Sequence, residues 1–147
     1  MHVEVCVNTD TLSHRQNITG QIFLVGNSWS FPIDGWSDFP VIVVAWWLEA
    51  LKNLLRDGGI AECQFMDGPY LFRVSSLASD KWLVECGRTD PDFSPQYSAV
   101  VQPREFMSSL RSAALSLIVA CNNHGWRTSD TKYLNQLCPP AVASGQQ

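Results

Sequence analysis

Charged residues are scarce in this 147-residue chain, where they make up 16% of the sequence against roughly 25% in typical globular proteins. The ten Lys and Arg residues are scattered singly and the formal net charge is −4, so the basic patch that a nucleic-acid-binding protein needs is missing. We therefore expect no nucleic-acid partner. A surface that is poor in charge is largely neutral or apolar, which favours a protein partner.

The chain also lacks an apolar stretch that is long enough to cross a bilayer. The longest apolar run, residues 39–48, has ten residues, whereas a membrane-spanning helix needs about 20. The first ten residues, MHVEVCVNTD, contain neither the charged segment nor the apolar segment of a secretory signal peptide. These features predict a cytoplasmic protein with no membrane partner.

Paired-cysteine motifs are absent as well. The five cysteines are widely spaced and include no CxxC pair, which favours free thiols in a reducing compartment. Cys121 and His124 lie three residues apart, but the two further ligands that a zinc site requires are not evident. We expect no disulfide framework, no metal site and no cofactor.

Catalytic signatures are equally hard to find. The chain has no Gly-x-Ser-x-Gly nucleophile elbow and no Gly-x-x-x-x-Gly-Lys phosphate loop. Two pairs of loop carboxylates, Asp34 with Asp38 and Asp90 with Asp92, could serve as acid and base, but aspartates at these spacings are common turn and cap residues. The sequence favours a non-enzymatic protein. A small hydrolase that uses Asp34, Asp38 or Asp67 is the alternative.

The most prominent feature that is present is an apolar segment at residues 39–56, which predicts a helix in the protein core. Ser37 or Asp38 is the expected N-cap of this helix. Because its first turns have no polar face, we expect them to be covered nearly all round, and we expect both Trp46 and Trp47 to be buried.

The remaining elements follow from shorter patterns. Strands are predicted at 2–8, 21–25, 61–66, 69–75, 81–87 and 97–101, with a polar loop at 9–20 and a tight turn at Asp67-Gly68. An amphipathic helix is predicted at 103–124, and a short third helix is predicted from a cap at Ser129 or Asp130 to Leu137.

The order of these elements predicts an α+β fold, because strands and helices do not alternate. We expect one antiparallel sheet of about five to six strands, with two main helices packed on one face and a short C-terminal helix. Residues 1–138 would form a single domain, and residues 139–147 a flexible tail.

Three loops combine carboxylates with aromatic residues, at 34–38, 67–70 and 90–97. Aromatic anchors beside charged groups are typical of protein–protein hot spots. For the aromatic residues among them, burial at the edge of the core is an equally reasonable alternative. The residues that we expect to contact a partner are Asp34, Trp36, Asp38, Asp67, Tyr70, Asp90, Asp92, Phe93 and Tyr97.

Several segments together resemble small bacterial immunity proteins: residues 35–40 (GWSDFP), 46–48 (WWL) and 65–70 (FMDGPY), followed by a closing amphipathic helix. Such proteins are cytoplasmic antidotes to contact-dependent or other polymorphic toxins, and they are often acidic α+β domains. The resemblance implies a non-enzymatic protein that binds a cognate toxin domain and occludes its active site. An acidic protein suits a nuclease toxin, whose cleft must present cations to phosphate. An adaptor subunit that forms a homodimer through an edge strand is a third hypothesis.

Overall fold

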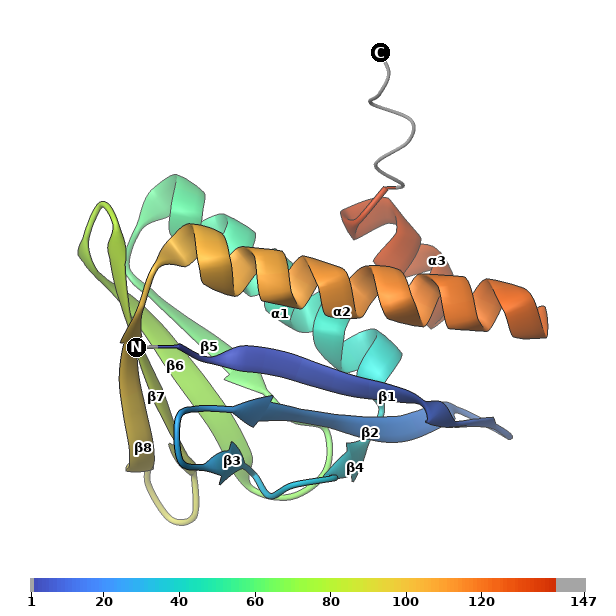
Figure 1. Cartoon of the computed structure of the whole chain (residues 1–147), viewed down its shortest axis with the longest axis horizontal. Coiled ribbons are helices and arrows are strands. Elements are labelled where there is room, and N and C mark those ends of the chain that lie inside the picture. Colours follow the sequence, from blue (N-terminus) through green and yellow to red (C-terminus); the bar gives the residue numbers. More distant parts are fainter. Residues whose placement is uncertain (1, 140–147) are drawn as a thin grey trace.

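The computed structural model describes residues 2–139 and has the α+β fold that the order of elements predicts (Figure 1). Within these residues there are two antiparallel sheets and three helices, α1 (Pro40–Asp57), α2 (Pro103–His124) and α3 (Ser129–Leu137). Sheet A contains β1 (Glu4–His14), β2 (Ile18–Val25), β3 (Ser30–Phe31) and β4 (Ser37–Asp38). Sheet B contains β5 (Ile60–Gln64), β6 (Tyr70–Ala78), β7 (Lys81–Arg88) and β8 (Ser94–Val101). Most of the predicted tail, residues 140–147, lies outside the described residues.

The expectation of a single sheet with five to six strands is wrong, because the strands divide into two sheets of four. In sheet A, β2 pairs with β1 on one side and with the two short strands β3 and β4 on the other. In sheet B, each strand pairs with the next one along the chain. The helix α1 is inserted between β4 and β5, and each group of strands completes its ladders by local hairpin pairing before or after it.

The core lies between the helices and the sheets, and aromatic side chains connect them. Trp47 of α1 makes edge-to-face contacts with Phe65 and Phe72, at centroid distances of 5.1 and 4.8 Å. Phe106 of α2 approaches Phe72 and Trp82 in the same manner, at 6.0 and 6.5 Å. Both main helices are therefore anchored on the inner face of sheet B, while α2 also runs along β1 (Figure 1).

The helix α1 differs in two details from its prediction. It begins at Pro40 with Phe39 as N-cap, and no side chain caps it. Trp47 is fully buried, but Trp46 is 36% exposed, so the prediction that both indoles are buried is wrong for Trp46. The physical reason is helical spacing, since Trp46 shares the exposed face with Glu49, three residues further on.

The first hairpin is longer than predicted. Residues 9–20 were expected to form a polar loop, but β1 continues to His14 and β2 begins at Ile18. The residues at the end of β1 alternate between exposed and half-buried positions, but most of them are polar, so no apolar alternation marks the strand in the sequence. The hairpin is secured at its far end, where the His14 ring contacts Trp126 at 5.4 Å and Trp126 stacks on His124 at 4.2 Å.

The two C-terminal helices follow their prediction closely. α2 has Pro103 in its first turn and ends at Gly125, whose φ of 72° provides the left-handed C-cap. The cap of α3 is Thr128 instead of Ser129 or Asp130, and it forms a reciprocal capping box with Thr131.

Candidate functional site

Three loops meet at one end of the molecule, at the bottom of Figure 1: residues 32–36 between β3 and β4, 65–69 between β5 and β6, and 89–93 between β7 and β8. We call these loops, with the strand residues that border them, the loop end. They contain or adjoin all the residues that the sequence predicts as partner contacts. The fold thus brings separate segments of the chain to one region.

A direct aromatic contact joins the first two loops. The rings of Trp36 and Tyr70 lie edge to face with a centroid distance of 5.3 Å, and both residues are half-buried. Gly68 forms the predicted hairpin turn with a φ of 74°. A Cβ at Gly68 would come within 2.9 Å of the Tyr70 ring and 3.4 Å of Trp36, so only glycine fits against this aromatic pair.

Asp38 is the residue whose placement differs most from its prediction, because it is 2% exposed and cannot be a rim charge that meets a partner. Its Oδ1 accepts the backbone N–H groups of Phe39 and Met66 at 2.7 and 3.1 Å. Its Oδ2 accepts the indole N–H of Trp36 at 2.9 Å and the backbone N–H of Asp67 at 3.1 Å. With both oxygens engaged, Asp38 fastens β4 to the β5–β6 turn and so holds two loops together.

Tyr97 belongs to the same aromatic group through two residues that the sequence reading did not single out. Its ring stacks on Trp29 at 4.9 Å with an interplanar angle of 6°. The fully buried Phe31 touches both Tyr70 and Tyr97, at 5.7 and 6.4 Å. Phe31 therefore supports the more exposed rings of Tyr70 and Tyr97 from the side of the core. The only signal in the sequence was the apolar spacing of residues 29 and 31.

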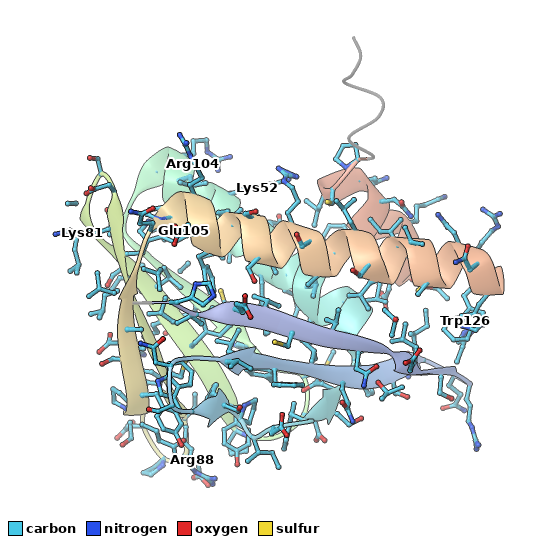
Figure 2. All side chains as sticks on the ribbon, in the orientation of Figure 1. Lys52, Lys81, Arg88, Arg104, Glu105 and Trp126 are labelled. Carbon is cyan, nitrogen blue, oxygen red and sulfur yellow. The ribbon has the colours of Figure 1, made fainter. Side chains whose placement is uncertain are left out.

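An arginine lies within this aromatic group. The Arg88 guanidinium lies 5.4 Å from the centre of the Tyr70 ring, and its Nη1 donates to the Tyr70 Oη at 3.2 Å. The two residues are direct cross-strand partners in β6 and β7, which explains the contact. Arg88 was not predicted, because its proximity to Tyr70 depends on strand register. Figure 2 places Arg88 at the bottom of the molecule, at the loop end.

The third loop folds beside a shallow pocket of about 380 Å³ on the outer face of sheet B. Phe93 is half-buried, and the Arg73 guanidinium lies 4.2 Å above its ring. Arg73 also pairs with Glu62 at 2.8 Å. Asp92 lines the pocket, as do Tyr70 and Phe93, whereas Asp90 is exposed outside it.

Asp34 is separated from these groups. It is exposed, and it faces sheet A, where its charge adds to the effect of burial and of Glu4 in raising the pKa of the Cys6 thiol. The carboxylate pair that the sequence offered as acid and base, Asp34 and Asp38, is thus divided between an exposed loop position and a buried hydrogen-bonded one.

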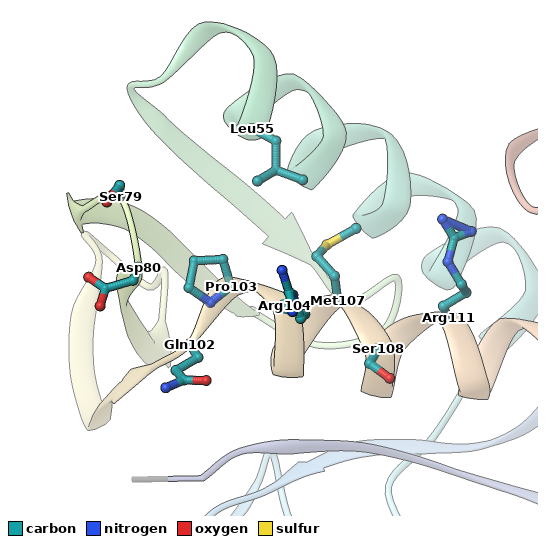
Figure 3. A pocket seen from close by; sticks show the side chains of 9 residues that line it. All are labelled: Leu55, Ser79, Asp80, Gln102, Pro103, Arg104, Met107, Ser108 and Arg111. Atoms are coloured by element: carbon teal, nitrogen blue, oxygen red, sulfur yellow. The ribbon is translucent and has the colours of Figure 1, made fainter.

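A larger groove lies away from the loop end, beside the β6–β7 turn. It has a volume of about 670 Å³ and runs between α1 and α2, where Leu55 faces Met107 (Figure 3). Arg104 and Arg111 line it from α2, and Asp80 closes its end. No residue that was predicted as a partner contact takes part in it.

Three further observations concern the chemistry of the chain. All five cysteines are free thiols. Among residues 2–139, no group of three or more His, Cys, Asp or Glu side chains is arranged to hold a metal ion. Within the same range, none of the helices combines the length and apolarity needed to cross a bilayer.

Comparisons with protein-family models, with curated proteins and with solved structures gave no match for this chain. The loop end is therefore the feature of the molecule that bears most directly on its function.

Proposed function

We propose that the protein is a non-enzymatic immunity-type protein that binds a toxin domain through the loop end and occludes its active site. The observation that carries the proposal is the contact between Trp36 and Tyr70, which unites two of the three predicted loops. Partly exposed aromatic rings on a rigid support are the usual anchors of tight protein–protein interfaces. Asp38 supplies that support from below.

The charge around the aromatic rings suits a basic partner. Asp34, Asp67, Asp90 and Asp92 are exposed at the loop end, whereas the nearby Arg88 is half-buried and engaged with Tyr70. A nuclease presents cations around its phosphate-binding cleft, so acidic loops would be attracted to it and would compete with its substrate. A nuclease toxin is therefore the partner class that we favour.

The direct test is to look for a toxin gene beside this one and to measure protection from its product, together with binding kinetics on the purified pair. We expect co-expression of the wild-type protein to restore growth. Phe93→Ala should speed dissociation of the complex by roughly 30-fold, the equivalent of about 2 kcal/mol for a hot-spot aromatic. Phe93 is chosen because it packs on the surface against Arg73 and not in the core.

Trp46→Ala is the matched control, since Trp46 is an aromatic residue that is 36% exposed but lies on α1, outside the loop end. This variant should dissociate at the wild-type rate. Equal dissociation rates for Phe93→Ala, Trp36→Ala and wild type would remove the loop end from the interface. Turnover of a small substrate by the isolated chain, lost on reversal of Asp34 or Asp67, would instead favour a hydrolase.

A further inference from the structure

The two sheets have four outer edges among the described residues, and three of them are blocked. On the outer side of sheet A, β1 is engaged by α2, because the Val5 N–H donates to Ser109 Oγ at 2.8 Å. The opposite edge consists of β3 and β4, which have two residues each. At the edge strand β5, the indole N–H of Trp47 donates to the Gln64 carbonyl at 2.7 Å, and Glu62 adds a charge. Covering, shortening and charging are the usual ways in which proteins protect sheet edges.

The fourth edge, β8, has little of this protection. It has eight residues and, in the described part of the chain, pairs only with β7; it lies at the lower left of the molecule in Figure 1. Six of its side chains are exposed, and its sequence, SPQYSAVV, contains no charged residue. Its protective features lie near its beginning: Pro95, which cannot donate a ladder hydrogen bond, and the register shift between Pro95 and Tyr97. The strand is thus open to regular pairing from Tyr97 onward.

We propose that β8 of one chain pairs antiparallel with β8 of a second copy, so that the two four-stranded sheets B join into one sheet of eight strands. This inference does not rest on the toxin-binding role, although both would use Tyr97, which lies on β8. The absence of charge favours a second copy as the occupant, because a two-fold axis places each strand opposite itself and would bring any charged residue close to its own duplicate. Because β8 has no charged residue, its pairing with a second copy brings no like charges together.

The register of this pair follows from the condition that opposed residues point to the same face of the sheet. The condition is met when Ser98 lies on the two-fold axis, where Tyr97 faces Ala99 of the second copy. The β7–β8 ladder shifts in register between Pro95 and Tyr97, so this irregularity ends the regular part of the seam on each side.

The experiment is sedimentation velocity on the full chain from low to high micromolar concentration. We expect a species with twice the 16.4 kDa mass of one chain to grow with concentration. Ser98→Lys should raise the dimer dissociation constant about fivefold or more, because it sets two lysines opposite each other. Ser75→Lys is the matched control, since Ser75 lies on the same outer face but on the inner strand β6, and it should leave the constant unchanged.

A cross-link provides a second measurement that does not depend on a destabilising charge. Opposed Cα atoms in an antiparallel pair are about 4.5–5.5 Å apart, within reach of a disulfide. Ser98→Cys should therefore give a covalent dimer on mild oxidation, whereas Ser75→Cys and wild type should not. A monomer at every concentration, a dimer that Ser75→Lys disrupts as strongly as Ser98→Lys does, or the absence of a Ser98→Cys cross-link would each overturn the proposal.

Discussion

At the scale of single residues, Asp38 organises the loop end from beneath its surface. Its four hydrogen bonds connect it to the indole of Trp36 and to backbone N–H groups on both sides, including those of Met66 and Asp67 in the β5–β6 turn. A carboxylate that accepts several N–H groups replaces the solvation it loses on burial. The geometry of the binding surface therefore depends on a residue that a partner would not touch.

We predict that Asp38→Asn lowers the free energy of unfolding by about 2–3 kcal/mol, because the amide nitrogen would face N–H donors that an oxygen now accepts. Asp34→Asn is the matched control, since Asp34 is exposed, and its effect should stay within about 0.5 kcal/mol. Urea unfolding of both variants checks this. Equal stability of the two would show that the hydrogen bonds of Asp38 contribute nothing net to the fold.

The neighbouring tryptophans of α1 give a second comparison. Trp47→Ala removes a fully buried indole that contacts Phe65 and Phe72, so it should cost about 3–5 kcal/mol. Trp46→Ala should cost less than about 1 kcal/mol, because Trp46 is partly exposed on the polar face of the helix. Thermal or urea unfolding measures both. Similar losses for the two variants would mean that the inner face of α1 is assigned wrongly.

These residues also show what the sequence could reveal. Trp46 and Trp47 are adjacent in an unbroken apolar run, and only the helical projection that includes Glu49 separates the exposed ring from the buried one. Asp34 and Asp38 are alike in composition and context, but Asp38 meets the N–H groups of a turn 28 residues further on. Sequence identifies residues that can bind or cap. It cannot identify donors that arrive from a distant hairpin.

At the scale of elements, two buried cysteines on the inner face of sheet B predict that the stability of the protein depends on pH. Cys63 on β5 and Cys86 on β7 are both buried, and they flank Phe72 of β6 in register. Burial raises the pKa of both thiols well above the ordinary cysteine value. Both side chains therefore stay protonated in the folded protein under conditions where the unfolded chain loses those protons.

The sign of the effect follows from proton binding. Above about pH 8.5 the unfolded chain loses these two protons while the folded protein keeps them, so stability falls as the pH rises, by up to about 3 kcal/mol per pH unit for the pair. Below that pH both states keep the two protons, so the thiols lower the free energy of unfolding by nothing there. Urea unfolding at about pH 8 and about pH 10 should show the decline.

The variant Cys63→Ala, Cys86→Ala isolates the contribution of the two thiols from that of other groups that titrate in alkali. Its stability will be lower at neutral pH, but it should decline less steeply between the two pH values. An identical decline in the variant and the wild type would contradict the assignment of the protonated thiols to the inner face of sheet B.

Elements were predicted well wherever a local signal determines them. The Asp67-Gly68 turn and the Pro103 start of α2 are written in residue chemistry that needs no tertiary contact. The length of the first hairpin was underestimated because the end of β1, residues 9–14, is mostly polar, so no apolar alternation marks it in the sequence. The cap of α3 was misplaced by a residue, since Thr128 and Ser129 are equally suitable in sequence and the reciprocal bond with Thr131 decides between them.

At the scale of the whole molecule, the division into two sheets could not be predicted, because strand patterns do not specify which distant strands pair. The gathering of the three loops at one end likewise follows from hairpin topology: the β5–β6 and β7–β8 turns lie at the same end of sheet B, and Asp38 brings the 32–36 loop of sheet A to them. The sequence indicated which residues could form a binding surface, but the arrangement of these residues depends on the fold.

The position of the charges leads to the last prediction. Asp90 and Asp92 are exposed in the 89–93 loop, so they should attract a basic toxin over distances on the order of the ~10 Å Debye length without being buried by it. The double reversal Asp90→Lys, Asp92→Lys should lower the association rate with the toxin about tenfold at low salt and much less at high salt, with little change in dissociation.

Asp80→Lys is the control, because Asp80 is an exposed turn residue at the opposite end of sheet B. It reverses one charge and not two, but even twice its effect on the logarithm of the association rate should remain well below the effect of the double reversal. Stopped-flow association at two ionic strengths measures this difference. Association that is independent of salt, or slowed equally by Asp80→Lys, would mean that the acidic loops do not steer the toxin and that the interface lies elsewhere on the protein.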